Sequence, residues 1–239
     1  MSILYAKAGG VVTITLNRPE SRNALNLEMC EGLLNAAQAA GADEAVRLVL
    51  VRGAGAVFCA GADLKERQGM DEARTRERRM KAFAAYSALE ALPMPAVAVV
   101  TGAAVGSGVE IAGACDFIVA TPEAWFATPE AVRGTVGATQ RLPRVLGARL
   151  AKDLMFTGRC LPAEEAQQHG FVSRIVPAAE LERELAVIAK TICEAPPKAL
   201  RFAKRCVATA EDGARAAALQ VEIDAIVAHL KQGGGLGKP

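Results

Sequence analysis

The stretch from Pro95 to Ala120, PAVAVVTGAAVGSGVEIAGACDFIVA, constrains the fold more than any other part of the chain. Apolar runs at 96–100 and 116–120 predict two buried strands. The residues between them predict a glycine-rich turn and a short apolar helix. A strand, helix and strand in this order imply parallel pairing through a right-handed crossover, so we predict an α/β fold.

One charged residue, Glu110, lies inside this predicted helix, between valine, isoleucine and alanine neighbours. A carboxylate buried without a partner keeps its proton more readily, which suits a general acid or base. The turn at 106–108 exposes backbone N–H groups at the helix N-terminus, where donors stabilise negative charge on a bound oxygen. The sequence therefore predicts an acid/base group and an oxyanion site within one helical turn.

The composition favours one large domain, or one domain with an appendage, because 239 residues with 51% hydrophobic content can fill a substantial core. A net charge of +2 gives no argument for a nucleic-acid partner. The longest apolar run, 96–104, is interrupted by Gly102 and is too short for a membrane span. The first ten residues do not predict a secretory signal.

The cysteines are scattered and form no CxxC pair, which favours reduced thiols in a cytoplasmic protein. Histidine, cysteine and aspartate show no metal-ligand spacing, so we expect no metal site.

Strands and helices are expected to alternate up to residue 177. Three helical segments follow, at about 178–193, 197–210 and 213–231, and the tail QGGGLGKP is expected to be flexible. This pattern predicts an α/β body over 1–177 and a helical region over 178–239. Within the body, the strand at 11–16 is expected to pair with 3–5 across a Gly-Gly turn, and the last strand to cover 171–176.

Two further features concern predicted helices. The helix expected at 71–92 has a basic first half, which we interpret as a solvated face; a contact to ligand phosphate is the alternative. Thr128, Pro129 and Glu130 predict a helix N-cap, a proline at the first helical position and a carboxylate in the first turn.

Thr101 to Gly108 also has the form TGxxxGxG, which is typical of a dinucleotide-binding turn. About a hundred residues precede it, no YxxxK motif accompanies it, and Asp116 begins the next strand instead of ending it, so we reject this hypothesis. Ser107 is not a nucleophile of the GxSxG type, because Val105 occupies the first glycine position.

Six blocks, in order, resemble the enoyl-CoA hydratase/isomerase (crotonase) superfamily over most of the chain. They are NRPE with NALN at 17–26, FCAGADLK at 58–65, GSGVEIA with ACD at 106–116, PE at 129–130, TQRLPR at 139–144, and the segment 154–171 with AQQHGFV. The resemblance implies a right-handed spiral of ββα units with a helical C-terminal trimerisation region. It also implies a homotrimer or hexamer that acts on an acyl-CoA thioester, with no cofactor because CoA is part of the substrate.

The resemblance assigns roles to particular residues. The backbone N–H groups of Ala62 and Ser107 would polarise the thioester carbonyl, although the second position is usually glycine. Glu110 and Glu130 occupy the positions of the two glutamates of the hydratase branch. Adding water across a conjugated C=C bond needs a carboxylate that deprotonates the water and a proton that reaches the α-carbon. The CoA contacts implied by the same motifs are Arg22, Ala24, Ala60, Gly61, Ala62, Asp63, Leu64 and Lys65.

The predicted function is therefore an enoyl-CoA hydratase. The loop between Glu130 and Thr139 is shorter than the family pattern, which bears on the placement of Glu130 and on the acyl pocket. A crotonase-type isomerase, hydrolase or decarboxylase is the first alternative, and a non-catalytic CoA-binding subunit is an alternative from another class.

Overall fold

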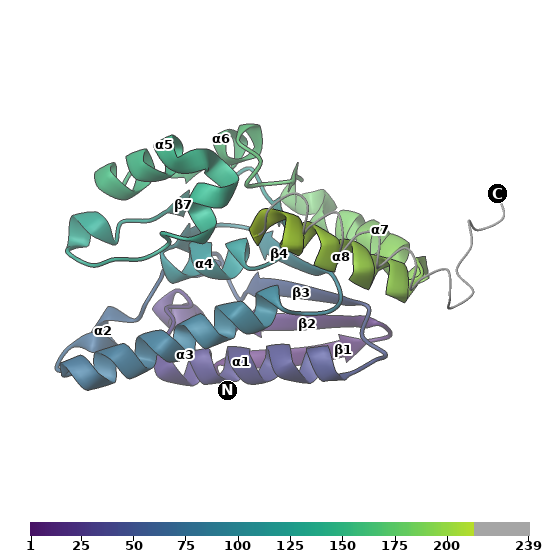
Figure 1. Cartoon of the computed structure of the whole chain (residues 1–239), viewed down its shortest axis with the longest axis horizontal. Coiled ribbons are helices and arrows are strands. Elements are labelled where there is room, and N and C mark those ends of the chain that lie inside the picture. The colour runs from purple at the N-terminus through teal and green to yellow at the C-terminus, as the bar shows by residue number, and fades with distance from the viewer. Residues whose placement is uncertain (213–239) are drawn as a thin grey trace.

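A computed structural model of the chain describes residues 1–212. Its strands form a six-stranded sheet in the order β1-β2-β3-β4-β6-β9 and a three-stranded sheet in the order β5-β7-β8 (Figure 1). The strands are β1 (Ile3–Ala8), β2 (Val11–Leu16), β3 (Leu48–Gly53), β4 (Ala96–Val100), β5 (Ala103–Val105), β6 (Phe117–Ala120), β7 (Trp125–Ala127), β8 (Leu161–Pro162) and β9 (Arg174–Ile175). The α-helices are α1 (Leu27–Ala42), α2 (Leu64–Arg67), α3 (Glu72–Glu90), α4 (Ser107–Gly113), α5 (Arg141–Thr157), α6 (Ala163–Gln168), α7 (Leu181–Glu194) and α8 (Pro197–Asp212). Short 3-10 helices cover Pro19–Ser21, Ala131–Arg133 and Ala178–Glu180.

The pairing of the large sheet follows the predicted alternation of strands and helices. β1 and β2 form an antiparallel hairpin, with Ile3 opposite Leu16 and Ala8 opposite Val11. Every other pair in this sheet is parallel, including β4 with β6 across α4. The α/β fold, the hairpin and the parallel crossover are therefore confirmed.

The central strands of the large sheet are buried on both faces, and their alternating side chains enter two different cores, whereas the edge strand β1 is mostly exposed. On β3, Val49 and Val51 join the main core with α1, α3 and α4, whereas Leu48 and Leu50 face a second core. In that second core they pack with Leu181, Leu185 and Ile188 of α7. Figure 1 shows α1 and α3 on one side of the sheet and α7 and α8 on the other.

The predicted C-terminal helices are confirmed as α7 and α8. The third predicted segment, 213–231, and the tail QGGGLGKP lie outside the described residues. The domain boundary at residue 177 stays a prediction. No helix of the described part, residues 1–212, is long and apolar enough to cross a membrane.

Several local predictions were wrong. The expected glycine-rich turn contains a strand, β5, which pairs with β7 in a second sheet that the sequence did not indicate. The last strand of the large sheet is only Arg174–Ile175. Thr128 caps no helix: the following turn is a 3-10 helix at Ala131–Arg133 capped by Glu130, and Thr128 Oγ1 is buried without a partner.

Candidate active site

A small cavity of about 70 Å³ brings together the four residues that the sequence assigned to chemistry. Ala62 lies on the loop after β3, Ser107 and Glu110 lie on α4, and Glu130 follows β7. Residues of α3, including Phe83 and Tyr86, complete the wall.

The Ala62 loop is held between two neighbouring segments. On one side, Leu25 forms a parallel bridge with Ala62 through Leu25 N to Gly61 O (2.7 Å) and Asp63 N to Leu25 O (3.0 Å). These bonds use the flanking residues of the loop, so the N–H of Ala62 faces away from Leu25. On the other side, Val105 N donates to Cys59 O at 2.8 Å.

Gly61, the residue before Ala62, lies close to the start of α4. Its φ is +94°, and a Cβ placed there would lie 3.0 Å from Val105 O and 4.0 Å from Ser107 N. A side chain would fill the space between the loop and the start of α4, so the loop requires glycine here.

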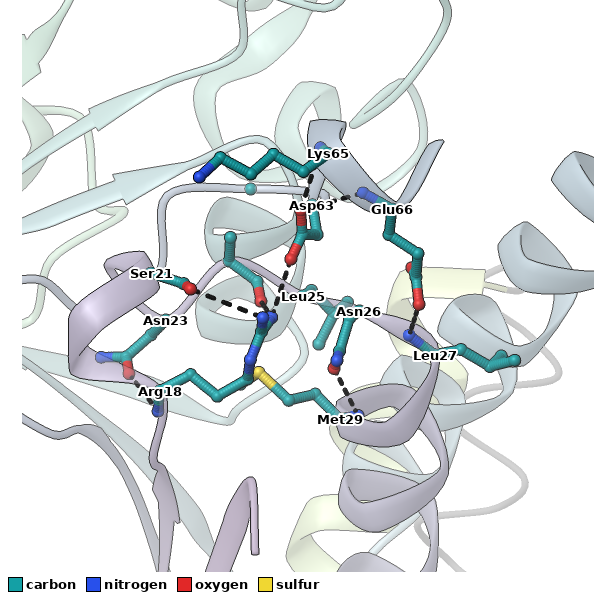
Figure 2. Close-up of polar contacts among 12 residues, drawn as sticks. Arg18, Ser21, Asn23, Leu25, Asn26, Leu27, Met29, Asp63, Lys65 and Glu66 are labelled. Atoms are coloured by element: carbon teal, nitrogen blue, oxygen red, sulfur yellow. Dashed lines mark hydrogen bonds and ion pairs between the residues drawn. The ribbon is translucent and has the colours of Figure 1, made fainter. Parts of the chain in front are cut away.

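An ion pair between Arg18 and Asp63 also holds the Ala62 loop in place (Figure 2). Arg18 Nη1 lies 2.9 Å from Asp63 Oδ2 and also donates to Ala24 O. Asp63 Oδ1 accepts from the N–H groups of Lys65 and Glu66 and so caps α2. Burial alone would raise the pKa of Asp63, but Arg18 and these N–H donors lower it overall.

The basic half of α3 is solvated at Arg74 and Arg76, as expected, but Arg78 is an exception. Arg78 is buried; its Nε donates to Glu66 Oε2 at 2.8 Å and its Nη2 to Leu25 O. Glu66 in turn accepts from Leu27 N at 2.8 Å (Figure 2). Arg78 therefore ties α3 to the segments that carry the predicted CoA contacts.

The predicted CoA contacts lie on these two clamped segments. Ala60 N donates to Arg22 O at 3.0 Å, which brings 22–25 beside 60–63. The side chains of Arg22 and Lys65 are exposed, and Figure 2 shows that of Lys65 extended away from the hydrogen-bonded network. Contacts of these residues with CoA stay predictions.

Ser107 is the first residue of α4, so its N–H has no acceptor within the helix. Its side chain and the buried phenol of Tyr86 line the same cavity. Burial raises the pKa of Tyr86, which therefore stays protonated at neutral pH.

Glu110 has a strong partner, contrary to the expectation of an isolated carboxylate. Arg141 Nη1 lies 2.9 Å from Glu110 Oε2, and Arg141 Nη2 lies 2.6 Å from Glu90 Oε2. Burial alone would lower the pKa of the Arg141 guanidinium, but the two carboxylates raise it overall. Arg141 thus stays positively charged beside Glu110.

Glu130 has no comparable partner. Its Oε2 is buried without a hydrogen bond, and burial raises its pKa, with the charge of Glu110 acting in the same direction. The carboxylate packs on Gly106, whose φ of +51° a side chain rarely adopts. The two glutamates therefore have different environments: one is ion-paired, and the other is desolvated.

A larger cavity of about 410 Å³ continues beyond Glu110. It shares Arg79, Phe83 and Glu110 with the small cavity and extends to the start of α5. A ligand whose carbonyl lay against Ala62 and Ser107 would have room for its far end here.

Tyr86 and Arg141 are site residues that sequence reasoning did not assign. Tyr86 belongs to no motif of the sequence, and Arg141 stands there only within the TQRLPR block. A pairing between residues 31 positions apart leaves no local pattern. Among residues 1–212, no group of three or more His, Cys, Asp or Glu side chains could hold a metal ion.

The family model described as enoyl-CoA hydratase/isomerase matches residues 6–233 of the chain. "Probable enoyl-CoA hydratase 2, mitochondrial" from Arabidopsis thaliana is 37% identical over 223 residues, which cover 92% of this chain and 74% of that protein. "Probable enoyl-CoA hydratase echA8" from Mycobacterium leprae is 40% identical over 81% of this chain and 76% of its own length.

Solved structures agree with these relatives. An enoyl-CoA hydratase from Bacillus anthracis superposes with a TM-score of 0.93 at 35% identity, covering 97% of this chain and 92% of that chain. An enoyl-CoA hydratase from Mycobacterium smegmatis gives a TM-score of 0.92 at 29% identity, covering 96% and 91%.

Proposed function

Because this chain belongs to the enoyl-CoA hydratase/isomerase family, a family of enzymes, we propose that it adds water reversibly to a 2-enoyl-CoA thioester. One observation carries the proposal: both glutamates and both candidate oxyanion residues line the same cavity. The fold is the crotonase fold, and the activity is that of a lyase.

In the proposed reaction, the thioester oxygen accepts hydrogen bonds from the N–H groups of Ala62 and Ser107. As charge develops on that oxygen, each well-placed donor stabilises the enolate by roughly 3–4 kcal/mol, as in acyl-transfer sites. The Ser107 N–H is free for this role because it begins α4.

The environments of the two glutamates divide the proton transfers between them. Glu110, ion-paired with Arg141, takes a proton from water while the water oxygen bonds to the β-carbon and the C=C electrons move to the thioester oxygen. Glu130, whose pKa is raised by burial, delivers a proton to the α-carbon as the enolate collapses. Water is consumed, and the two carboxyls recover their protonation states by exchange with solvent.

The test is Glu110→Gln, assayed by the loss of the conjugated enoyl thioester chromophore. We expect acyl-CoA binding to be retained and hydration to fall by about 10²–10⁴-fold, the usual contribution of a general base. Unchanged turnover would contradict the proposal.

Isomerisation is the second candidate, because the matching family description names both activities. Hydrolysis and decarboxylation are further alternatives, because the short loop after Glu130 bears on the placement of that glutamate and on the acyl pocket. Mass spectrometry of the products from a small enoyl-CoA panel separates these reactions: hydration adds one water, isomerisation leaves the mass unchanged, and hydrolysis releases free CoA. Binding of the panel without any product would support a non-catalytic CoA-binding subunit.

We also propose a homotrimer or hexamer that needs no cofactor beyond the CoA of its substrate and works in the cytoplasm. Relatives from Arabidopsis thaliana, Mus musculus and Bos taurus carry the word mitochondrial in their names. Light scattering after size exclusion tests the assembly, and cell fractionation tests the location.

A further inference from the structure

Three buried side-chain polar atoms in the described part of the chain have no hydrogen-bond partner: Thr128 Oγ1, Glu130 Oε2 and Arg141 Nε. Such atoms are few in native proteins, because each one costs stability. Two belong to residues at the cavities just described, and the third lies two residues before Glu130. Of the two, Glu130 transfers a proton in the proposed reaction, whereas Arg141 enters it only as the ion-pair partner of Glu110.

Arg141 is fixed on three sides. Its Nη1 lies 2.9 Å from Glu110, its Nη2 lies 2.6 Å from Glu90, and its Cζ lies 6.0 Å from the centre of the Tyr86 ring. Its side chain is 19% exposed, so its charge is only partly screened by water. The guanidinium therefore has one orientation, set by both carboxylates and an aromatic face.

We propose that Arg141 is a positioning residue that holds the Glu110 carboxylate through their ion pair and aims it at the water to be activated. This inference rests on the proposed hydratase function. Arg141 contacts only Oε2 of Glu110, so the bond leaves Oε1 for the water. Arg141 lines the larger cavity and not the small one, whereas Glu110 lines both.

The groups around Glu110 explain why it needs this partner. They are Arg79, Tyr86 and Glu90 of α3, Arg141 and Arg144 of α5, and Glu130. Glu130 repels a negative charge on Glu110 only when Glu130 is itself ionised, and Tyr86 stays neutral. Among the ion pairs described for residues 1–212, only Arg141 pairs with Glu110. Loss of the Arg141 charge would leave the Glu110 carboxylate without this stabilising partner.

The experiment compares the pH profiles of kcat/KM for the wild type, Arg141→Gln and Arg141→Lys. In Arg141→Gln, we expect the acid limb to move up by about 1 pH unit or more. We also expect turnover at the optimum to fall on the order of 10²-fold through misplacement of Glu110. Arg141→Lys keeps the positive charge but loses the planar guanidinium that contacts both Glu90 and Glu110. Its acid limb should therefore stay near that of the wild type, while its turnover should be reduced.

Arg159→Gln is the matched control. Arg159 also bridges two carboxylates, with Asp153 and Glu165 each at 2.7 Å, but it does not line either cavity. This variant should change stability alone and leave the pH profile in place. Thermal melting of each variant shows whether it is folded. If Arg141→Gln does not fold, the pH profile and turnover of Arg141→Lys are compared with those of the wild type instead.

The outcomes separate the two proposals. An acid limb that stays in place in folded Arg141→Gln, or that moves equally in Arg159→Gln or in Arg141→Lys, overturns the positioning role. A wild-type protein that hydrates no enoyl-CoA in the panel overturns the proposed function itself, and the inference with it.

Discussion

Replacing Gly106 by alanine separates the placement of Glu130 from the stability of the fold. A Cβ at Gly106 would lie 2.2 Å from Glu130 Oε1, whereas ordinary contact begins at 3.4 Å. The carboxylate must therefore move by about 1.2 Å. It can do so at little cost to folding, because it is the end of a flexible side chain.

The two expected effects have different sizes and causes. A displacement near 1 Å at a catalytic group lowers kcat/KM by about 10²-fold. Separately, alanine at a φ of +51° and a ψ of −106° destabilises the fold by about 1–3 kcal/mol. The assays are hydration of a short enoyl-CoA and urea denaturation followed by circular dichroism.

Gly9→Ala is the control, because Gly9 has a similar φ of +56° with no atom within 4 Å of the added Cβ, in the β1–β2 turn. It should lose stability but keep full activity. Gly106→Ala with kcat/KM within a factor of two of the wild type would refute the contact between Gly106 and Glu130 as a determinant of catalysis.

Three further predictions test other parts of the site. The free energy of unfolding of Glu130→Gln, relative to the wild type, should increase as pH rises. The reason is that the raised native pKa of Glu130 makes the wild type less stable from pH 4.5 upward, where the carboxyl ionises in the unfolded chain. Urea denaturation at pH 4 and pH 8 measures the difference between the two proteins, and an equal difference at both pH values would contradict the prediction. Asp63→Ala should cost about 2–4 kcal/mol, since it removes the α2 cap and leaves Arg18 without its carboxylate, whereas Asp63→Asn keeps the cap and should cost less. Burial raises the pKa of Cys59 to about 12, so iodoacetamide at pH 8 should alkylate exposed Cys160 first; equal labelling by mass spectrometry would show that Cys59 is accessible.

The sequence predicted those features that depend on local pattern. The apolar runs of β3, β4 and β6 are long enough to indicate buried strands, and the Gly-Gly step placed the β1–β2 hairpin. The second sheet was not predicted, because β5 and β7 have three residues each, too few to show the two-residue alternation of a strand.

At the site, the resemblance identified Glu110 and Glu130 by their positions in the motifs, but it did not predict which residues contact their carboxylates. The expectation that Glu110 lacks a partner failed because Arg141 comes from another helix, 31 residues along the chain. The predicted cap at Thr128 failed because the chain forms a 3-10 turn that begins after Glu130 instead. The first error concerns a tertiary contact, which no local periodicity records, and the second concerns the local choice between a 3-10 turn and an α-helix.

The contact of Arg141 with Glu90 and Glu110 also has a consequence for folding order. Its partners lie 51 and 31 residues earlier, so the ion pairs form only after long loops have closed. By contrast, β1 and β2 close across a single turn. Enzymatic activity should therefore return late during refolding. The single tryptophan, Trp125 on β7, gives a fluorescence signal five residues before Glu130, against which that delay can be timed.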